Sequence, residues 1–299
     1  MNRPDAREGE ERRGGTRRHS LILASLTFLL LFLSWAFWRS HFIHSQAGEV
    51  PAFAREFPAV KSGPPAFSFN GKDLAGFTTY TRFHKYDDPD GDFTVRDGMV
   101  RVSGREFGGF ATRDSFADYH LVVEWKWGNR AWYPRRWGAR NSGIMVHGVG
   151  PDGDALGAWM ESIECQLIEG GSGDLLLVPG KGRPGPALTV EVRKGPDGQP
   201  YYRKGGTPLR RSGIRFNWWG RDPAWKDVLW YRGPDDVERP VGEWNRMEVV
   251  CDGDSITCIL NGILVNAGTG SSVKSGKILF QSEGAEVFFR KIEVRPILR

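Results

Sequence analysis

Ser162-Ile163-Glu164-Cys165-Gln166-Leu167-Ile168-Glu169-Gly170-Gly171 is the stretch that decides the fold. Apolar side chains alternate with polar ones through its first six residues. This period of two predicts a β-strand with one face in a core and the other face open. Glu164 and Gln166 lie two residues apart, so both are expected on the open face, where they can meet a ligand.

Segments 120–127 and 141–147 show the same alternation. In each of them one face is apolar and the opposite face carries titratable or amide side chains. If these strands pair in register, their polar faces lie on one side of a single sheet. The predicted site face therefore carries five side chains: Glu124, Asn141, His147, Glu164 and Gln166.

The composition favours one large β domain. Among 299 residues there are 39 glycines, 18 prolines and 12 tryptophans, and no long amphipathic helical pattern interrupts the short strands and turns. The net charge of +5 is spread over distant arginine pairs without interleaved aromatic residues. Nucleic acid is therefore not an expected partner.

Three cysteines are too few for a disulfide framework. Cys165 falls on the apolar face of its strand, where a buried thiol is expected. Cys251 and Cys258 flank a turn and can oppose each other across a hairpin. A bridge between them in an oxidising compartment is the alternative that the sequence leaves open.

The first part of the chain predicts export. Residues 1–20 are polar and rich in arginine, and residues 21–38 carry no charge over a length near the minimum for a membrane-spanning helix. We expect a signal anchor, with a signal peptide cleaved after residues 45–47 as the alternative. The membrane is then a partner, and the bulk of the chain is anchored facing outward or lies in the periplasm. Residues 39–65 are predicted to be a linker.

Residues 66–299 are predicted to form the globular domain. Turn signals at Asp97-Gly98 and Asn261-Gly262 indicate hairpins. The segment 180–240, rich in glycine and proline, is interpreted as an insertion over the open face. The loop 128–140 carries Trp132 and Arg135, and it is expected to wall the site.

The acidic loop 87–92 does not fit the helix-loop-helix calcium pattern, because it lacks the required glycine and the distal glutamate. A solvated turn is expected there, and a structural calcium site of another geometry is the alternative. The sequence shows no other metal site and no required cofactor.

Several motifs occur in the order of a known family. They are Phe69-Asn70-Gly71-Lys72-Asp73-Leu74, Asn141-Ser142-Gly143-Ile144, Ser162-Ile163-Glu164-Cys165-Gln166, Gly242-Glu243-Trp244-Asn245, Asn261-Gly262, Ser275-Gly276-Lys277-Ile278 and Phe289-Arg290-Lys291-Ile292. The set, from about Ala66 to Leu298, resembles the 3-keto-disaccharide hydrolase domain. In that family the last motif usually has asparagine where Lys291 stands. The resemblance implies a concanavalin A-like jelly-roll β-sandwich, an exported bacterial protein and activity on glycosides oxidised at C3.

An ordinary glycosidase needs two carboxyl groups flanking the scissile bond. Glucanases of the implied fold carry Glu-x-Asp-x-x-Glu, and here Gln166 stands in the place of the aspartate between Glu164 and Glu169. Strict alternation points Glu169 away from Glu164 unless a bulge intervenes. The ordinary mechanism therefore lacks a carboxyl group.

A 3-keto sugar requires different groups. Its ketone acidifies the proton at C2, so a base can start elimination of the group at C1, and water then adds to the enone. Glu164 is the expected base, His147 the expected acid or alternative base, and Glu124 a second carboxylate. The expected substrate-binding residues are Asn141, Gln166, Trp132, Arg135 and Gln281.

Two other functions remain open. The domain can be a non-catalytic carbohydrate-binding module at the cell surface, with the same fold. It can also be an ordinary β-glucanase, which would act on unoxidised glucans. A carbohydrate is the expected ligand in all three cases.

Overall fold

The computed structural model describes residues 50–299. The predicted tail 1–20 and the predicted membrane segment 21–38 lie outside the described residues, as does the part of the predicted linker before residue 50. The single helix in the described part, α2 (Ala52–Arg55), has four residues. No helix in residues 50–299 has the length and apolarity needed to span a bilayer.

Two antiparallel sheets form a sandwich, which confirms the predicted all-β class. We name the larger one the back sheet. Its path is β16-β15-β14-β6-β18-β4-β3, and β1 pairs with β18 at one end. Its strands are β1 (Phe67–Ser68), β3 (Phe93–Arg96), β4 (Met99–Val102), β6 (Tyr119–Ala131), β14 (Asn245–Asp252), β15 (Ser255–Leu260), β16 (Ile263–Gly268) and β18 (Ala285–Pro296).

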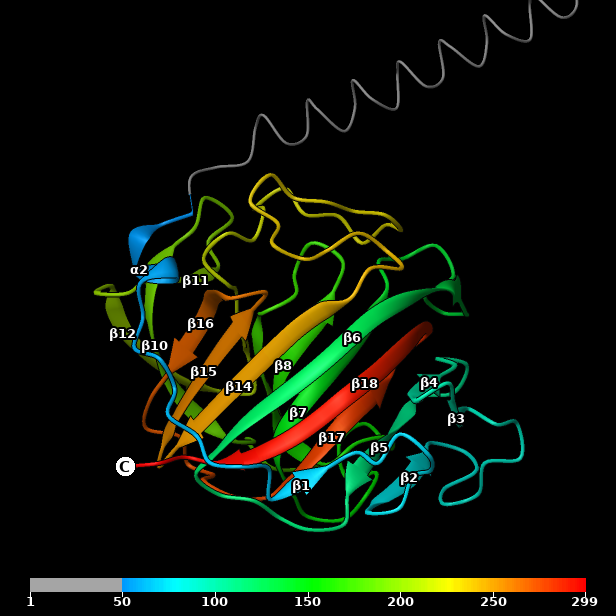
Figure 1. Cartoon of the computed structure of the whole chain (residues 1–299). Helices are drawn as coiled ribbons and strands as arrows, with labels where there is room; N and C mark the ends of the chain where they lie inside the picture. The colour runs from blue at the N-terminus through cyan, green and yellow to red at the C-terminus, as the bar shows by residue number, and fades with distance from the viewer. Residues whose placement is uncertain (1–49) are drawn as a thin grey trace, which may run out of the picture. The chain divides into compact units, whose positions relative to one another are not determined.

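The second sheet, named the front sheet, has the order β13-β9-β8-β7-β17-β5-β2. Its strands are β2 (Phe77–Thr81), β5 (Gly108–Thr112), β7 (Asn141–Val149), β8 (Glu161–Ile168), β9 (Leu175–Val178), β13 (Arg215–Phe216) and β17 (Lys277–Ser282). Figure 1 views the molecule from the side of the back sheet. Its long strands β14, β6 and β18 are therefore nearer the viewer, and β8, β7 and β17 of the front sheet lie behind them.

The core between the sheets follows from period-two alternation. Ile163, Cys165 and Leu167 of β8 are fully buried in one cluster with Val123 and Trp125 of β6. Burying each such side chain contributes about 1.5–3 kcal/mol. The face of β8 that was expected to be open is also covered. Glu164 and Gln166 on this face are only 3% and 2% exposed. The segment 180–240 accounts for this cover.

That segment contains a small third sheet of β10 (Ala187–Lys194), β11 (Pro200–Tyr202) and β12 (Thr207–Ser212). The short strand β13 of the front sheet follows it, and an irregular stretch then continues as far as β14. Residues from both parts face the same cavity as Glu164. The predicted position of this insertion, over the front sheet, is confirmed.

The predicted hairpin turns are present. Asp97 and Gly98 both have positive φ (52° and 74°), which suits the tight turn that joins β3 to β4. Asn261 and Gly262 adopt the same conformation (52° and 80°) between β15 and β16. Asparagine, aspartate and glycine tolerate this left-handed conformation better than other residues do.

The interpretation of residues 39–65 as a linker is wrong for the part that the structure describes. Phe53 of α2 packs edge-on against Tyr202 and Trp219, with ring centroids 5.9 and 6.4 Å apart. Ser62 pairs with Ile297 beyond the end of β18. Proline and charge content suggested a loose segment, but its apolar side chains are used in packing.

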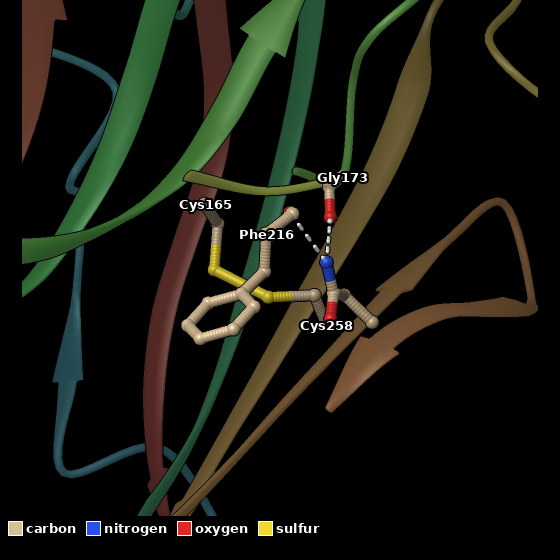
Figure 2. Close-up of a disulfide and its surroundings, with 5 residues drawn as sticks. Cys165, Gly173, Phe216 and Cys258 are labelled. Carbon is tan, nitrogen blue, oxygen red and sulfur yellow. Dashed lines mark hydrogen bonds between the residues drawn. A yellow bond between two sulfur atoms is a disulfide. The ribbon is translucent and has the colours of Figure 1, made fainter. Parts of the chain in front are cut away.

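The cysteine pairing differs from both alternatives. Cys165 of β8 is joined to Cys258 of β15, so the bridge links the front sheet to the back sheet (Figure 2). Cys251 is buried and free, because its hairpin partner across β14 and β15 is Ile256. Beside the bridge, the Asn266 amide donates hydrogen bonds to the backbone oxygens of Gly173 and Phe216 (Figure 2).

Candidate functional site

A cavity of about 540 Å³ lies over the front sheet, on the side facing away from the core. Its floor is made of polar side chains from the three neighbouring strands β7, β8 and β17. The floor residues are Asn141, Glu164, Gln166 and Gln281. All four side chains are buried. Asn141, Glu164 and Gln166 were predicted to share one face, and the structure brings them together with Gln281, which was expected to bind substrate.

Glu164 projects from β8 into this floor, and its carboxylate lies against Gly143 of β7. An added Cβ on Gly143 of the neighbouring strand would collide with the Glu164 carboxylate, so glycine at this position makes room for that side chain. Its Oε1 has no hydrogen-bond partner. Burial, together with the negative charge of Glu283, raises the pKa of Glu164 to about 8, and Arg215 partly opposes this rise.

Glu283 is another carboxyl group that lines the cavity, and its charge acts on Glu164. It lies in the turn after β17, two residues beyond Gln281. Burial raises the pKa of Glu283 to about 7, although Arg135, Arg215 and the Asn141 amide favour its charged form. Two carboxyl groups that each repel the other's charge release their protons in two steps. Near neutral pH the pair is therefore expected to hold about one proton.

Two arginines that line the cavity, Arg215 and Arg221, are held in place by one buried carboxylate. Asp174, with no exposed surface, accepts hydrogen bonds from Arg215 (3.0 Å) and from Arg221, and a third from the backbone N–H of Trp218 (2.9 Å). The Arg221 guanidinium also lies 4.4 Å from the ring centroid of Trp225. Because these contacts fix the guanidinium groups, the cavity has preorganised cationic donors.

A third arginine reaches the cavity from the loop 128–140. Both Nε and Nη2 of Arg135 donate to the backbone oxygen of Ala139 at 3.1 Å, and Nη2 also donates to Asp227 at 2.8 Å. Asp227 itself accepts the backbone N–H of Ala139. Arg135, which was expected to bind substrate, therefore lines the cavity, and these hydrogen bonds fix its orientation.

The model of the 3-keto-alpha-glucoside-1,2-lyase-like domain family matches residues 66–295. This range includes both sheets and every floor residue of the cavity. The chain belongs to this family. The resemblance inferred from the sequence motifs is confirmed, and the family is a glycoside-acting one. No curated protein matches the chain.

Solved structures resemble the chain at low sequence identity. A protein from Parabacteroides distasonis ATCC 8503, provisionally assigned as a glycosyl hydrolase, is 19% identical over 77% of this chain and 92% of its own, with a TM-score of 0.44. A galectin-like protein of unknown function from Bacillus subtilis is 12% identical over 81% and 100%, with a TM-score of 0.46. The Bacillus licheniformis β-glucanase is 12% identical over 79% and 99%, with a TM-score of 0.38.

His147 does not lie at the cavity of this family domain, which corrects the prediction that it shares a face with Glu164. Its φ is +54°, and the pairing of β7 with β8 is irregular between Val146 and Val149. The ring therefore turns toward the sandwich interior, where it packs edge-on against Tyr119 of the back sheet. Nδ1 lies 2.9 Å from the backbone oxygen of Val273, and burial lowers the pKa of His147.

Glu124 and Trp132 are also misplaced by the sequence prediction. Glu124 belongs to β6, which pairs with β14 and β18 in the back sheet, and its carboxylate accepts a hydrogen bond from Arg290 at 2.6 Å. The Trp132 indole donates to the backbone oxygen of Ser103 and does not line the cavity. Alternation predicts which face a side chain takes but not which sheet its strand joins.

Glu169 points away from Glu164, as strict alternation predicts. It is buried in an ion pair with Arg140 at 2.7 Å, and it does not line the cavity. Glu169 therefore does not supply the second carboxyl group that an ordinary glycosidase requires beside Glu164.

No metal cluster is present in residues 50–299, since no three His, Cys, Asp or Glu side chains there converge on one point. In the acidic loop, the Asp88 carboxylate accepts the backbone N–H groups of Asp92 (2.6 Å) and Phe93 (2.9 Å). Asp92 is buried beside Ser103. These two carboxylates are therefore engaged within the loop.

Several cavity residues were missed from the sequence. Glu283 had a usable signal, because it follows Gln281 by two residues and so continues the same strand face. The wall residues from the insertion had none, since no regular period places them. They are Asp197, Asn217, Arg215, Arg221 and Trp225.

Proposed function

We propose that this chain cleaves glycosides oxidised at C3 by removing the C2 proton and eliminating the group at C1. The observation that supports this best is the pair Glu164 and Glu283. Both carboxyl groups line one cavity, each has a raised pKa, and fixed arginine and amide donors surround them. Family membership supports the same chemistry.

The reaction needs one proton acceptor and one proton donor. The acceptor takes the proton from C2, and the charge moves to the C3 oxygen as an enolate. Reformation of the C3 ketone then creates a C1–C2 double bond and expels the oxygen at C1, which is protonated as it leaves. Water adds to C1 and a proton returns to C2, so the net reaction is hydrolysis.

The surroundings of the two carboxyl groups suggest the division of roles. Arg135, Arg215 and the Asn141 amide favour the charged form of Glu283, so we assign it as the base. Burial and the charge of Glu283 favour the protonated form of Glu164, so we assign it as the acid for the leaving group. This exchanges the role that the sequence suggested for Glu164, and it replaces His147, which lies in the interior.

The surrounding donors suit the developing charge. Arg135 and Arg215 both act electrostatically on Glu283, so they lie where an enolate oxygen formed beside that carboxylate would be stabilised. Gln281 is buried and its Oε1 has no hydrogen-bond partner. A buried amide without a partner is costly, and a sugar hydroxyl would satisfy it.

The direct test is release of 4-nitrophenol from the α- and β-anomers of 4-nitrophenyl 3-keto-glucoside, compared with the unoxidised glycosides. We expect release from the 3-keto substrate only. Release from the unoxidised compounds would indicate an ordinary glycosidase. No release above the background of heat-denatured protein, together with measurable sugar binding, would indicate a carbohydrate-binding domain.

We further propose that the domain is exported and tethered to the membrane by residues 21–38. The uncharged run in the sequence supports this, and so does the Cys165–Cys258 bridge, since structural disulfides persist in oxidising compartments. Protease treatment of spheroplasts, in which any outer membrane has been opened, should digest the domain. Protection of the domain until the inner membrane is lysed would contradict export.

A further inference from the structure

Three large aromatic side chains project into solvent from the two segments that carry the cavity residues Arg135 and Asp227. They are Tyr133, Trp137 and Trp230, which are 86%, 75% and 60% exposed, and we name them the aromatic rim. Trp137 and Trp230 come from neighbouring backbones, because the N–H of Leu229 donates to the backbone oxygen of Trp137. Exposed aromatic residues gathered at one place are a common mark of a binding surface.

The rim continues the edge of the cavity. Arg135 and Asp227 both line the cavity and are joined by a hydrogen bond of 2.8 Å. Trp137 follows Arg135 by two residues, and Trp230 follows Asp227 by three. A ligand that fills the cavity and extends past this ion pair would therefore reach the rim.

Trp230 has an unfavourable backbone conformation, although its side chain is mostly exposed and gains little from packing. Its φ is +66°, a left-handed value that is unfavourable for a bulky residue. The backbone N–H of Trp230 donates to Glu169, and the Arg140 guanidinium lies 4.0 Å from the centroid of its rings. Glu169 and Arg140 form a buried ion pair. A buried anchor thus fixes a mostly exposed indole, and strain retained in this way is typical of functional positions.

We propose that the aromatic rim binds a further sugar unit of the substrate, beyond the sugar that occupies the cavity. This inference rests on the proposed function only in taking the cavity ligand to be a glycoside. A pyranose has an apolar face that stacks on an aromatic ring and a rim of hydroxyl groups. A charged donor accompanies the rings here, since the Arg136 guanidinium lies 5.2 Å from the Trp137 ring centroid. This mixture favours a sugar over an apolar aglycone.

The test measures binding, so it does not require turnover. Isothermal titration calorimetry on the full chain in detergent would use glucose and α- and β-linked gluco-oligosaccharides of two to five units. For one linkage series we expect the affinity to rise by about tenfold or more between one unit and three. Trp137→Ala and Trp230→Ala should each abolish most of this rise, whereas Trp230→Phe should keep part of it.

Trp244→Ala is the matched control. This tryptophan lies between Arg290 and Lys126 of the back sheet and does not line the cavity, so its removal should leave the chain-length dependence unchanged. The inference is overturned if the wild-type chain shows no dependence on length, or if both rim variants keep it. It is also overturned if the variants lose affinity only for 4-nitrophenyl glucosides, which would indicate an aglycone site. Failure of 3-keto cleavage with chain-length-dependent binding would overturn the proposed reaction and leave the rim intact.

Discussion

Replacing Glu164 by glutamine should make the folded chain more stable at alkaline pH. The carboxyl group of Glu164 is buried at the cavity floor, and its Oε1 has no hydrogen-bond partner. Deprotonation there places a charge in a poorly solvated site next to Glu283. Glutamine has nearly the same shape and carries no charge, so it removes this cost.

The magnitude follows from the pKa. The value rises from 4.5 in the unfolded reference to about 8 in the fold. Between these two values the folded chain retains a proton that the unfolded chain has released, so the free energy of unfolding falls as the pH rises. At about 1.4 kcal/mol for each pKa unit, the loss reaches at most about 5 kcal/mol. Water entry and local relaxation reduce it, so we expect roughly 2–4 kcal/mol.

Urea unfolding of the wild-type chain and of Glu164→Gln at pH 5 and pH 9 measures this difference. Titration of all other groups is common to both proteins and cancels to first order. The variant should gain about 2–4 kcal/mol relative to wild type on going from pH 5 to pH 9. Glu243→Gln, at an exposed glutamate, is the control and should gain nothing. A gain below about 0.5 kcal/mol for Glu164→Gln would refute the assignment of a raised pKa.

Four further predictions follow from the same geometry. Gly143→Ala should lower kcat/KM on a 3-keto-glycoside by about a hundredfold, because the added methyl displaces the Glu164 carboxylate; unchanged kinetics would contradict this. The pH–rate profile should be a narrow bell between the pKa values of about 7 for Glu283 and about 8 for Glu164, and a rate that is flat from pH 6 to pH 9 would disprove the paired roles. Glu164→Gln should slow poor leaving groups far more than 4-nitrophenol, and equal losses would argue against Glu164 as the acid. Cys258→Ser should lower the free energy of unfolding by about 2–4 kcal/mol in thermal or urea unfolding, because it opens a bridge that closes a separation of 93 residues; an unchanged midpoint would show that the bridge does not form.

The sequence predicts the local features of the fold correctly, namely strand alternation and tight turns. Alternation in 162–168 correctly separates the core residue Cys165 from the cavity residues Glu164 and Gln166. The turn at Asp97-Gly98 is where a hairpin needs left-handed residues. These features depend on neighbours in the chain, so a single sequence is sufficient to predict them.

Features that depend on distant partners were not predictable in this way. Glu124 has the same alternation as Glu164, but backbone pairing places its strand in the other sheet. His147 leaves its expected face because one residue adopts a left-handed conformation. Cys165 pairs across the sandwich with Cys258, a contact that no local spacing indicates. The cavity walls come from an irregular insertion, whose position depends on buried pairs such as Asp174 with Arg221.

The proposed mechanism requires that the cavity carboxyl groups remove and return a proton at C2. Running the reaction of a 3-keto-glycoside in D₂O and analysing the released sugar by proton NMR tests this most directly, with the spontaneous C2 exchange of product incubated alone subtracted. Elimination and hydration predict deuterium at C2 of the product, as the proton taken by Glu283 exchanges with solvent, and a slower reaction of substrate deuterated at C2. A released sugar that retains its original C2 hydrogen, formed at an unchanged rate from substrate deuterated at C2, would mean direct displacement at C1 and would contradict the mechanism.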